Sequence, residues 1–477
     1  MTISGLASKP SHAVGLATGV LGAAVLGAVA VAYLPLMWAG VLVLGCAVSL
    51  LTVADPLAGL ALVVFAVPFG SFFDLQIGGA NVGVTEALVW LVLAAWAMRM
   101  MARRQARLAL TGLGVALCLL LVAMLASLLT AGTLEPGVKE AVKWVEVLAL
   151  YLLVSQEMNE RWLGPLVATI LLTGGLAALQ GIYQFVFRVG PEPFVLFGRY
   201  MRAHGTFGQP NPYAGYLGLS ATLALGVGLG SLARGQSRSR VGWLVLAVVT
   251  GLLMSAAVAL SWSRGSWLGL ATAIVVMAGV AAYRSRKRVV ATGLLVMVIL
   301  VALLVVGFFG VPSAVTDRLA DLVPSLAVND VRGMEVTDAN FAVLERMAHW
   351  QAALAMWTDH PWLGVGIGNY AAAYASYSVP PWDEPLGHAH NYYLNIGAET
   401  GLVGFLAYVL VWCLGAVAAL RACRTSRGWH AGLSVGILGA LTYLSVHNLF
   451  DNLFVHGIYL LVAILLGMAA YLRKGAR

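Results

Sequence analysis

The sequence predicts an all-α integral membrane protein that crosses the bilayer many times. Of its 477 residues, 61% are hydrophobic and only 10% are charged, whereas about 25% of the residues of a typical soluble protein are charged. Apolar runs recur from Ala13 to Leu472, and only residues 311–390 form a polar stretch long enough to fold outside the membrane. These observations exclude a soluble enzyme and a globular domain held by one membrane anchor.

About fourteen apolar runs are long enough to cross roughly 30 Å of hydrocarbon as helices. The expected helices lie near residues 13–33, 36–53, 56–72, 84–98, 108–130, 140–155, 163–187, 212–232, 241–260, 266–283, 289–310, 392–420, 431–447 and 456–472. The first three are closely spaced and short of charge, so one hairpin there could be re-entrant, and we expect about 12–14 transmembrane helices. The chain then divides into N-terminal helices, a transmembrane core, an outer polar loop and C-terminal helices, at residues 1–137, 138–310, 311–390 and 391–477.

The basic residues set the expected orientation of these helices. If both termini are cytoplasmic, 19 of the 28 basic residues lie on the cytoplasmic side, together with only three acidic residues. Lysine and arginine favour that side of a membrane protein. We therefore interpret the net charge of +8 as an orientation signal and not as a nucleic-acid surface. The first apolar run has no cleavage site after it, so we expect a membrane span there and not a signal peptide.

A loop at 198–212, on the face opposite the basic clusters, combines several polar side chains. Arg202 and His204 precede Asn211, which lies between two prolines directly before the next apolar run. These side chains are therefore held close to the bilayer surface. Anchoring among lipid headgroups is the alternative to a binding role.

The turn at 261–267 lies on the same face and contains a single charge. Arg264 occupies the tip of this tight turn, and no acidic residue is near it in the sequence. A guanidinium group suits the paired anionic oxygens of a phosphate. The alternative is again contact with lipid headgroups.

The polar stretch 311–390 is predicted to contain an amphipathic helix up to residue 357 that lies along the membrane interface. Arg346 and His349 are expected on or near its polar side. A His-Pro break and a glycine-rich turn follow. The stretch thus combines ionisable side chains with a fold outside the hydrocarbon.

His388 and His390 end this stretch and precede the next membrane helix. We expect no metal ion or other cofactor, because no His-Glu-x-x-His or Asp-x-Asp pattern is present and the four cysteines lack zinc-ligand spacing. An imidazole, whose unperturbed pKa is about 6.5, suits proton transfer from a hydroxyl. The pair is therefore a candidate for general-base chemistry.

Four motifs in order resemble those of the O-antigen ligase and O-antigen polymerase superfamily. They are Arg-Ala-His-Gly-Thr-Phe-Gly-Gln-Pro-Asn-Pro-Tyr at 202–213, Ser-Trp-Ser-Arg-Gly-Ser-Trp at 261–267, Arg346 with His-Pro-Trp-Leu-Gly-Val-Gly at 360–366, and His-Ala-His-Asn-Tyr-Tyr-Leu at 388–394. The resemblance covers about the C-terminal two thirds of the chain. It implies an all-helical membrane glycosyltransferase of the GT-C type in the bacterial inner membrane, with its site at the periplasmic face.

The resemblance also implies roles for individual residues. Arg202 and Arg264 would hold the diphosphate of a glycan carried on undecaprenyl diphosphate, and His390 would be the base for the acceptor hydroxyl. Further candidates are polar residues of the same motifs, namely His388, Arg346, Asn391, His204 and Asn211. Two guanidinium groups can stabilise the leaving diphosphate without a metal, and one base opposite it gives an inverting displacement.

The acceptor distinguishes the functions that the resemblance allows. We expect transfer to a lipid A core sugar, as in an O-antigen ligase, and the alternative is polymerisation onto a second lipid-linked glycan. The ligase pattern has Thr-Gly where this sequence has Gly404-Phe405. A polysaccharide transporter or flippase is the third hypothesis. It predicts ionisable residues inside helices and internal repeats, whereas charges here gather between the apolar runs.

The orientation is testable with cysteine labels in a variant whose native cysteines are replaced. Labels at Ser285 and Thr425 should react only from the cytoplasmic side, because basic clusters flank both positions, and a label at Ser266 only from the outer side. Reaction with a membrane-impermeant maleimide, in intact and in opened cells, measures this. Residues 285 and 266 reacting from one side would contradict the predicted hairpin.

Overall fold

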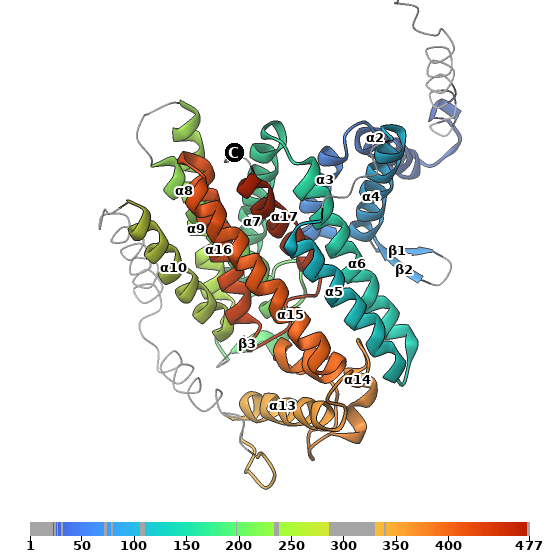
Figure 1. The fold of residues 1–477 in the computed structure, drawn as a ribbon, viewed down its shortest axis with the longest axis vertical. Coiled ribbons are helices and arrows are strands. Elements are labelled where there is room, and N and C mark those ends of the chain that lie inside the picture. The colour runs from blue at the N-terminus through green and yellow to red at the C-terminus, as the bar shows by residue number, and fades with distance from the viewer. Residues whose placement is uncertain are drawn as a thin grey trace, which may run out of the picture.

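The computed structural model shows a bundle of helices with two short β-hairpins (Figure 1). It describes residues 22, 25, 27–29, 32–70, 74–77, 80–104, 110–196, 198–232, 238–285, 330–337 and 340–474. The predicted helix near 289–310, most of the helix near 13–33, and residues 311–329 of the polar stretch lie outside the described residues.

The described elements follow the predicted runs closely. The α-helices are α2 (Leu36–Ala54), α3 (Pro56–Phe69), α4 (Val84–Ala102), α5 (Gly112–Ser127), α6 (Leu134–Glu157), α7 (Glu160–Phe187), α8 (Pro210–Ser231), α9 (Arg238–Leu260), α10 (Arg264–Ser285), α13 (Phe341–Asp359), α14 (Tyr370–Ala373), α15 (Tyr392–Thr425), α16 (Gly428–His447) and α17 (Ile458–Lys474). The short 3-10 helices are η2 (Leu128–Thr130), η3 (Glu192–Phe194) and η5 (Tyr374–Ser376).

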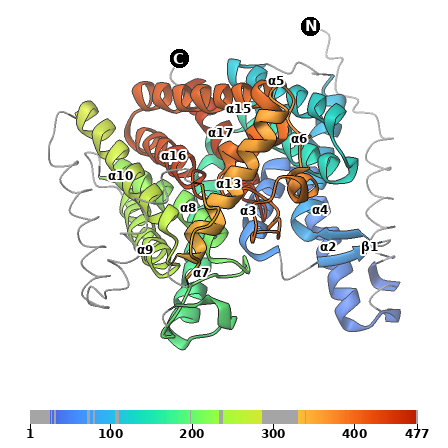
Figure 2. The same cartoon turned by 90° about the horizontal axis from the view of Figure 1, so that it is seen from below.

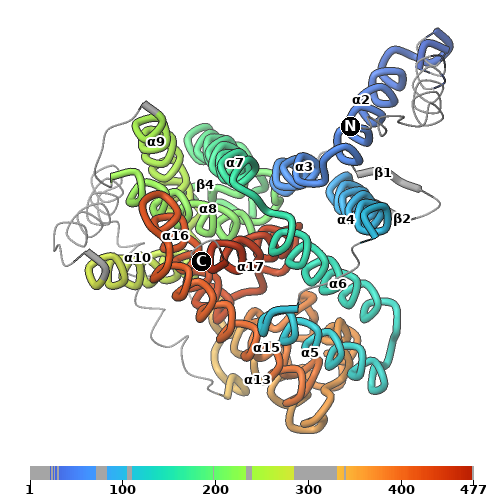
Figure 3. The backbone as a smooth tube through the Cα atoms, turned by 45° about the horizontal axis from the view of Figure 1, so that its top comes forward, coloured from blue at the N-terminus to red at the C-terminus, as the bar shows by residue number. Residues whose placement is uncertain are grey.

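Nine helices within the described ranges are long and apolar enough to cross a membrane. They confirm the predicted fold class, a polytopic and mostly helical membrane protein. α2 projects from the bundle beside α3 and α4 (Figure 3), and its apolar side chains are mostly exposed, as expected for a helix surrounded by lipid. The total of 12–14 spans also depends on residues outside the described ones and stays a prediction.

Two antiparallel hairpins were not predicted from the sequence. β1 (Asp74–Ile77) pairs with β2 (Ala80–Gly83), and β3 (Val195–Leu196) pairs with β4 (Tyr200–Met201). The second hairpin leads into the loop at 198–212, here called the first arginine loop; the turn at 261–267 is the second arginine loop. This hairpin shapes the segment that leads into Arg202, whose amide donates to the carbonyl of Phe194 at 2.9 Å.

The C-terminal helix α15 is bent where its backbone is opened for a partner. Gly401 has φ 62° and ψ −164° inside the helix. The carbonyls of Ala398 and Glu399 accept the amides of Val365 and Gly366 at 2.9 and 3.0 Å. The predicted glycine-rich turn after α13 therefore docks on α15 through backbone hydrogen bonds, which fixes α13 against this helix.

The two ends of the bundle differ in composition. α13 lies across one end (Figures 1 and 2). At the other end the predicted cytoplasmic segments meet, since Arg103 lies 3.5 Å from Glu157, and Glu160 lies 3.0 Å from His430. The described basic clusters thus gather at the end opposite α13. Which side of the membrane this end faces stays a prediction.

The centre of the bundle is α8, which is buried on nearly all sides against α9 and α16. α8 and α16 cross so closely that a Cβ on Gly226 would overlap the backbone of Gly436 and Gly432. Small residues allow this approach of two helices in a membrane protein. The crossing positions the turn that follows α16, where the candidate site begins.

We expect Gly226→Val to destabilise the protein by more than about 1–3 kcal/mol, because the new side chain meets backbone and not a flexible side chain. Thermal unfolding of the purified protein in detergent measures the loss. Gly242→Val on α9 is the matched control, since no atom lies within 4 Å of the Cβ position there. Equal unfolding temperatures for the two variants would contradict the tight crossing.

Candidate functional site

The first arginine loop folds back onto the second. Arg202 Nε donates to the carbonyl of Ser261 at 2.9 Å, and its Nη2 donates to Asn211 Oδ1 at 3.0 Å. The amide of Ala203 also donates to the carbonyl of Leu260 at 3.0 Å. Arg202 is therefore held at the turn between α9 and α10, and Asn211 orients its guanidinium group. Two predicted site residues meet here.

Arg264 is the first residue of α10 and is only 6% exposed. A guanidinium group in contact with lipid headgroups at the water–lipid boundary would be largely exposed, so this burial argues against that alternative. The turn itself is closed by the amide of Ser263, which donates to Ser261 Oγ at 3.2 Å. Arg202 and Arg264 thus belong to one local structure, because Arg202 bonds to the same turn.

His204 is placed apart from the other two predicted histidines. Gln184 of α7 binds its loop, since Gln184 Oε1 accepts the amides of His204 and Gly205 at 3.2 and 2.7 Å. The His204 ring is buried, packs on Phe194 with the ring centres 5.2 Å apart, and has Nδ1 3.1 Å from the carbonyl of Arg202. These contacts fit a role in holding the loop that carries Arg202.

The start of α10 packs against the end of α16. Ser266 Oγ lies 3.3 Å from His447 Nδ1 and accepts a hydrogen bond from Tyr443 Oη at 3.0 Å. After His447 the chain turns, and Asn448 accepts the amide of Tyr392 on its carbonyl at 2.8 Å. This turn therefore connects the arginine loops to the start of α15.

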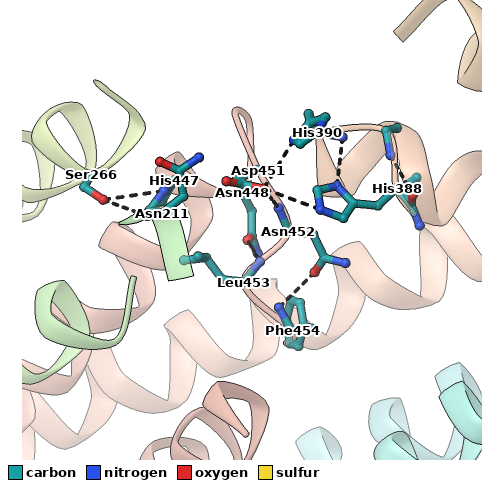
Figure 4. A network of polar contacts seen from close by, with 12 residues as sticks. Asn211, Ser266, His388, His390, His447, Asn448, Asp451, Asn452, Leu453 and Phe454 are labelled. Atoms are coloured by element: carbon teal, nitrogen blue, oxygen red, sulfur yellow. Dashed lines mark hydrogen bonds and ion pairs between the residues drawn. The ribbon is translucent and has the colours of Figure 1, made fainter. Parts of the chain in front are cut away.

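Asp451 lies in this turn and was missed by the sequence analysis. Its side chain faces His388 and His390 (Figure 4). Asp451 Oδ1 lies 3.7 Å from His388 Nε2 and 3.6 Å from His390 Nδ1. The acid is 61 residues after His390 in the sequence. No local motif links the two, and an Asp-Asn pair before an apolar run was the only signal.

The loop before α15 holds the two histidines in fixed positions. His390 has φ 51°, and its amide donates to His388 Nδ1 at 3.1 Å. Asn391 Oδ1 accepts the amides of Tyr393 and Leu394 at 3.0 and 3.2 Å, so it is the N-cap of α15. Asn391 thus contributes by ending the loop at a defined point.

α13 supplies the remaining charged and ionisable groups. His349 is 1% exposed, and its ring packs edge-on against that of His390 at 5.8 Å. Burial, followed by the charges of His390 and His388, lowers the pKa of His349 to about 3. Burial raises the pKa of Glu345, against the opposing charges of His390 and Arg346. The predicted polar side of α13 is therefore turned toward the histidines.

These charges assign protonation states near neutral pH. Burial alone would raise the pKa of Asp451, but contact with His390 and the charges of His390, His388 and Arg346 lower it well below its usual range. Burial and then the charge of His390 lower the pKa of His388 to about 4, against the opposing effect of Asp451. An ionised Asp451 next to His390 can stabilise an imidazolium ion, which is what a proton acceptor becomes.

His388, His390 and Asp451 could also hold a metal ion. One ligand atom from each residue lies within 4.8 Å of the other two. Two imidazoles and a carboxylate suit zinc or another transition metal. In a metal-bound catalytic site, however, the ligand atoms usually lie closer to one another. In the sequence only the two histidines stand together as possible metal ligands, because the third ligand is remote in the chain. Metal independence stays a prediction.

Comparison with known proteins finds a family model that matches part of this site. Residues 249–409 match the family model described as O-antigen ligase. The match includes Arg264, Arg346, His388 and His390. The chain is also similar to an uncharacterized protein of Haemophilus influenzae, 26% identical over 196 residues, which are 40% of this chain and 46% of that protein. The chain thus spans about half the length of the curated relative that it matches.

The buried neutral His349 predicts a stability that falls in acid. Its pKa in the folded protein is below the unfolded value of about 6.5, so the unfolded state binds more protons between about pH 6.5 and pH 3. Stability is therefore present above this range and falls as the pH drops through it, by at most about 1.4 kcal/mol per pH unit for one group.

We expect His349→Gln to flatten the dependence of the unfolding temperature on pH between pH 7 and pH 4.5. His430→Gln is the control, because His430 is partly exposed at the other end of the bundle. The slope of unfolding temperature against pH reports the titration of His349, whereas the unfolding temperature at a single pH also includes the loss of stability caused by the substitution itself. Equal slopes for His349→Gln and the unsubstituted protein would contradict the assignment.

Proposed function

We propose that this chain, which carries an O-antigen ligase family domain at residues 249–409, is a membrane glycosyltransferase. It transfers a glycan from undecaprenyl diphosphate to an acceptor hydroxyl, inverts the anomeric centre and needs no metal. The observation that carries the proposal is that the turn after α16 brings two arginine loops and a histidine–carboxylate pair together. The site then faces the periplasm, and the protein resides in the bacterial inner membrane.

Arg202 and Arg264 are proposed to bind the diphosphate of the donor. Arg264 directly follows the α9–α10 turn, and Arg202 is hydrogen-bonded to the same turn, where Asn211 and Ser261 hold its guanidinium group. The amide groups that begin α10 add a partial positive charge at the same place. As the bond to the sugar breaks, negative charge grows on the diphosphate, and groups already aimed at it stabilise the transition state.

His390 is proposed to be the general base. Since Nδ1 faces Asp451, the tautomer with its proton on Nδ1 leaves Nε2 to accept the proton of the acceptor hydroxyl. The hydroxyl oxygen forms a bond to the anomeric carbon while the bond to the diphosphate breaks. Asp451 balances the positive charge on His390, and the diphosphate leaves with the bonding electron pair.

The acceptor is proposed to be a lipid A core sugar, which makes the reaction that of an O-antigen ligase. The second candidate is a polymerase that uses another lipid-linked glycan. One observation supports the polymerase as a second candidate: a Cβ on Gly404 would overlap the side chain of Thr400. A threonine, as in the ligase pattern, would not fit there without rearrangement of α15.

Transfer assays with the purified protein in proteoliposomes test the proposal. The donor is a glycan on undecaprenyl diphosphate, and the acceptors are core lipid A and a second molecule of donor. We expect release of polyprenyl diphosphate together with a glycosylated lipid A core. Release only with chain extension would indicate the polymerase, and movement of intact donor across the bilayer without release would indicate a flippase.

Single-turnover rates of variants test the proposed roles. Arg264→Ala should cost on the order of 2–4 kcal/mol of transition-state stabilisation. Arg264→Lys should restore little of the rate, because lysine lacks the planar guanidinium group that donates two parallel hydrogen bonds to a phosphate. His390→Ala should lower the rate by about 10²–10⁴-fold, and Asp451→Asn by on the order of 10²-fold. Asp383→Asn, an exposed acid outside the site, is the matched control and should leave the rate unchanged.

A chelator distinguishes the base from a metal site. Activity should survive EDTA, because the proposed reaction needs only the histidine and the arginines. Loss of transfer in EDTA that zinc restores would instead assign His388, His390 and Asp451 to a metal. An active His390→Ala protein would also overturn the proposed base.

A further inference from the structure

A charged pocket lies at the end of the bundle opposite the candidate site. Its volume is about 190 Å³, and it opens between the start of α3, the end of α4, the end of α6 and the start of α7. Three arginines line it, Arg99, Arg103 and Arg161, together with two acidic side chains. None of these residues takes part in the proposed transfer, so the pocket needs a separate explanation.

The pocket is built by contacts among its own walls. Asp55 is the N-cap of α3, accepts the indole Nε1–H of Trp162 on Oδ2 at 2.8 Å, and lies 3.9 Å from Arg99. Arg103 lies 3.5 Å from Glu157. Asp55 is therefore committed to holding α3, α4 and α7 together, and it keeps Arg99 and Trp162 in place around the opening.

The charges of the lining do not cancel. Three guanidinium groups face the two carboxylates of Asp55 and Glu157, which leaves one net positive charge. Arg161 lies over the Trp162 ring at 5.9 Å. Both residues are in the first turn of α7, where the helix amides favour an anion. A single negative charge with several acceptor oxygens would complement this lining.

The place of the pocket in the bundle narrows the class of ligand. It lies at the ends of apolar helices, where lipid headgroups contact a membrane protein. Tryptophan, here Trp162, is enriched at this membrane–water interface. A phosphodiester carries one negative charge, and basic pockets between membrane helices bind lipid headgroups. We propose that this pocket binds the phosphate of an anionic phospholipid headgroup such as phosphatidylglycerol.

Net charge distinguishes phosphatidylglycerol from zwitterionic phospholipids as a ligand for this pocket. Phosphatidylglycerol neutralises the pocket, whereas a zwitterionic headgroup brings its own ammonium charge next to three arginines. Arginine binds phosphate oxygens through two parallel hydrogen bonds. The bound lipid would hold the ends of α4 and α7 together, and it would act independently of the transfer reaction.

The test measures binding of defined lipids to the full-length protein in a neutral detergent. Native mass spectrometry counts retained lipid, and thermal unfolding measures stabilisation with phosphatidylglycerol, phosphatidylcholine or inorganic phosphate. We expect phosphatidylglycerol to be retained and to raise the unfolding temperature, because a ligand that binds only the folded state stabilises it. Phosphatidylcholine and inorganic phosphate should do neither.

Two variants separate the pocket from general surface charge. Arg103→Gln with Arg161→Gln should weaken retention of phosphatidylglycerol by roughly tenfold or more, since each removes a charge-assisted contact. Arg424→Gln with Arg427→Gln removes two exposed charges at the same end, outside the pocket, and should retain the lipid. If the first pair does not fold, lipid retention by the Arg161→Gln variant alone is measured by mass spectrometry. Arg161 is exposed, and the side chain that caps the start of α7 is that of Asn159, so this single variant should fold.

Three results would overturn the proposal. Equal retention by the pocket variant and the control pair would place the lipid elsewhere. An equal effect of phosphatidylcholine would indicate unspecific solvation by lipid. Full stabilisation by inorganic phosphate would make the pocket a site for a soluble anion. None of these measurements requires glycan transfer, so the outcome is independent of the proposed function.

Discussion

Asp451 carries its charge in a turn where the residue is only 5% exposed, and burying a charge costs several kcal/mol unless other groups compensate it. The compensation comes from contact with His390 before α15 and from the charge of Arg346 on α13. Three segments that are separate in the chain are thus held by one carboxylate. The candidate base takes its position from this arrangement, and the rest of the end that α13 crosses packs around it (Figure 1).

The same turn is also fixed from its other side. Ser266 and Tyr443 contact His447 at the end of α16, so a shift of α10 would move the turn. α16 in turn depends on its close crossing with α8, which only glycines allow. The geometry between the arginines and the histidines is therefore determined by helix packing inside the membrane, and the loops follow it.

Much of the fold was predictable because membrane spans are local in sequence. An apolar run must be helical in lipid, since each backbone group needs a partner within the segment. The N-cap Asn391 and the prolines in the first turn of α8 mark the helix starts. The hairpin that leads into Arg202 was not predicted, because two strands of two residues each carry too little pattern to be recognised.

The sequence by itself determined the helical membrane fold, the separation of the basic clusters from the two arginine loops, and the types of residue able to bind a diphosphate and accept a proton. These follow from local composition and spacing. Only the tertiary structure decided which of them meet: Asn211 orients Arg202, His204 stays with its own loop, and Asp451 faces His390. The physical reason is that the charge of a buried group acts over a few ångströms in space, whatever the distance along the chain.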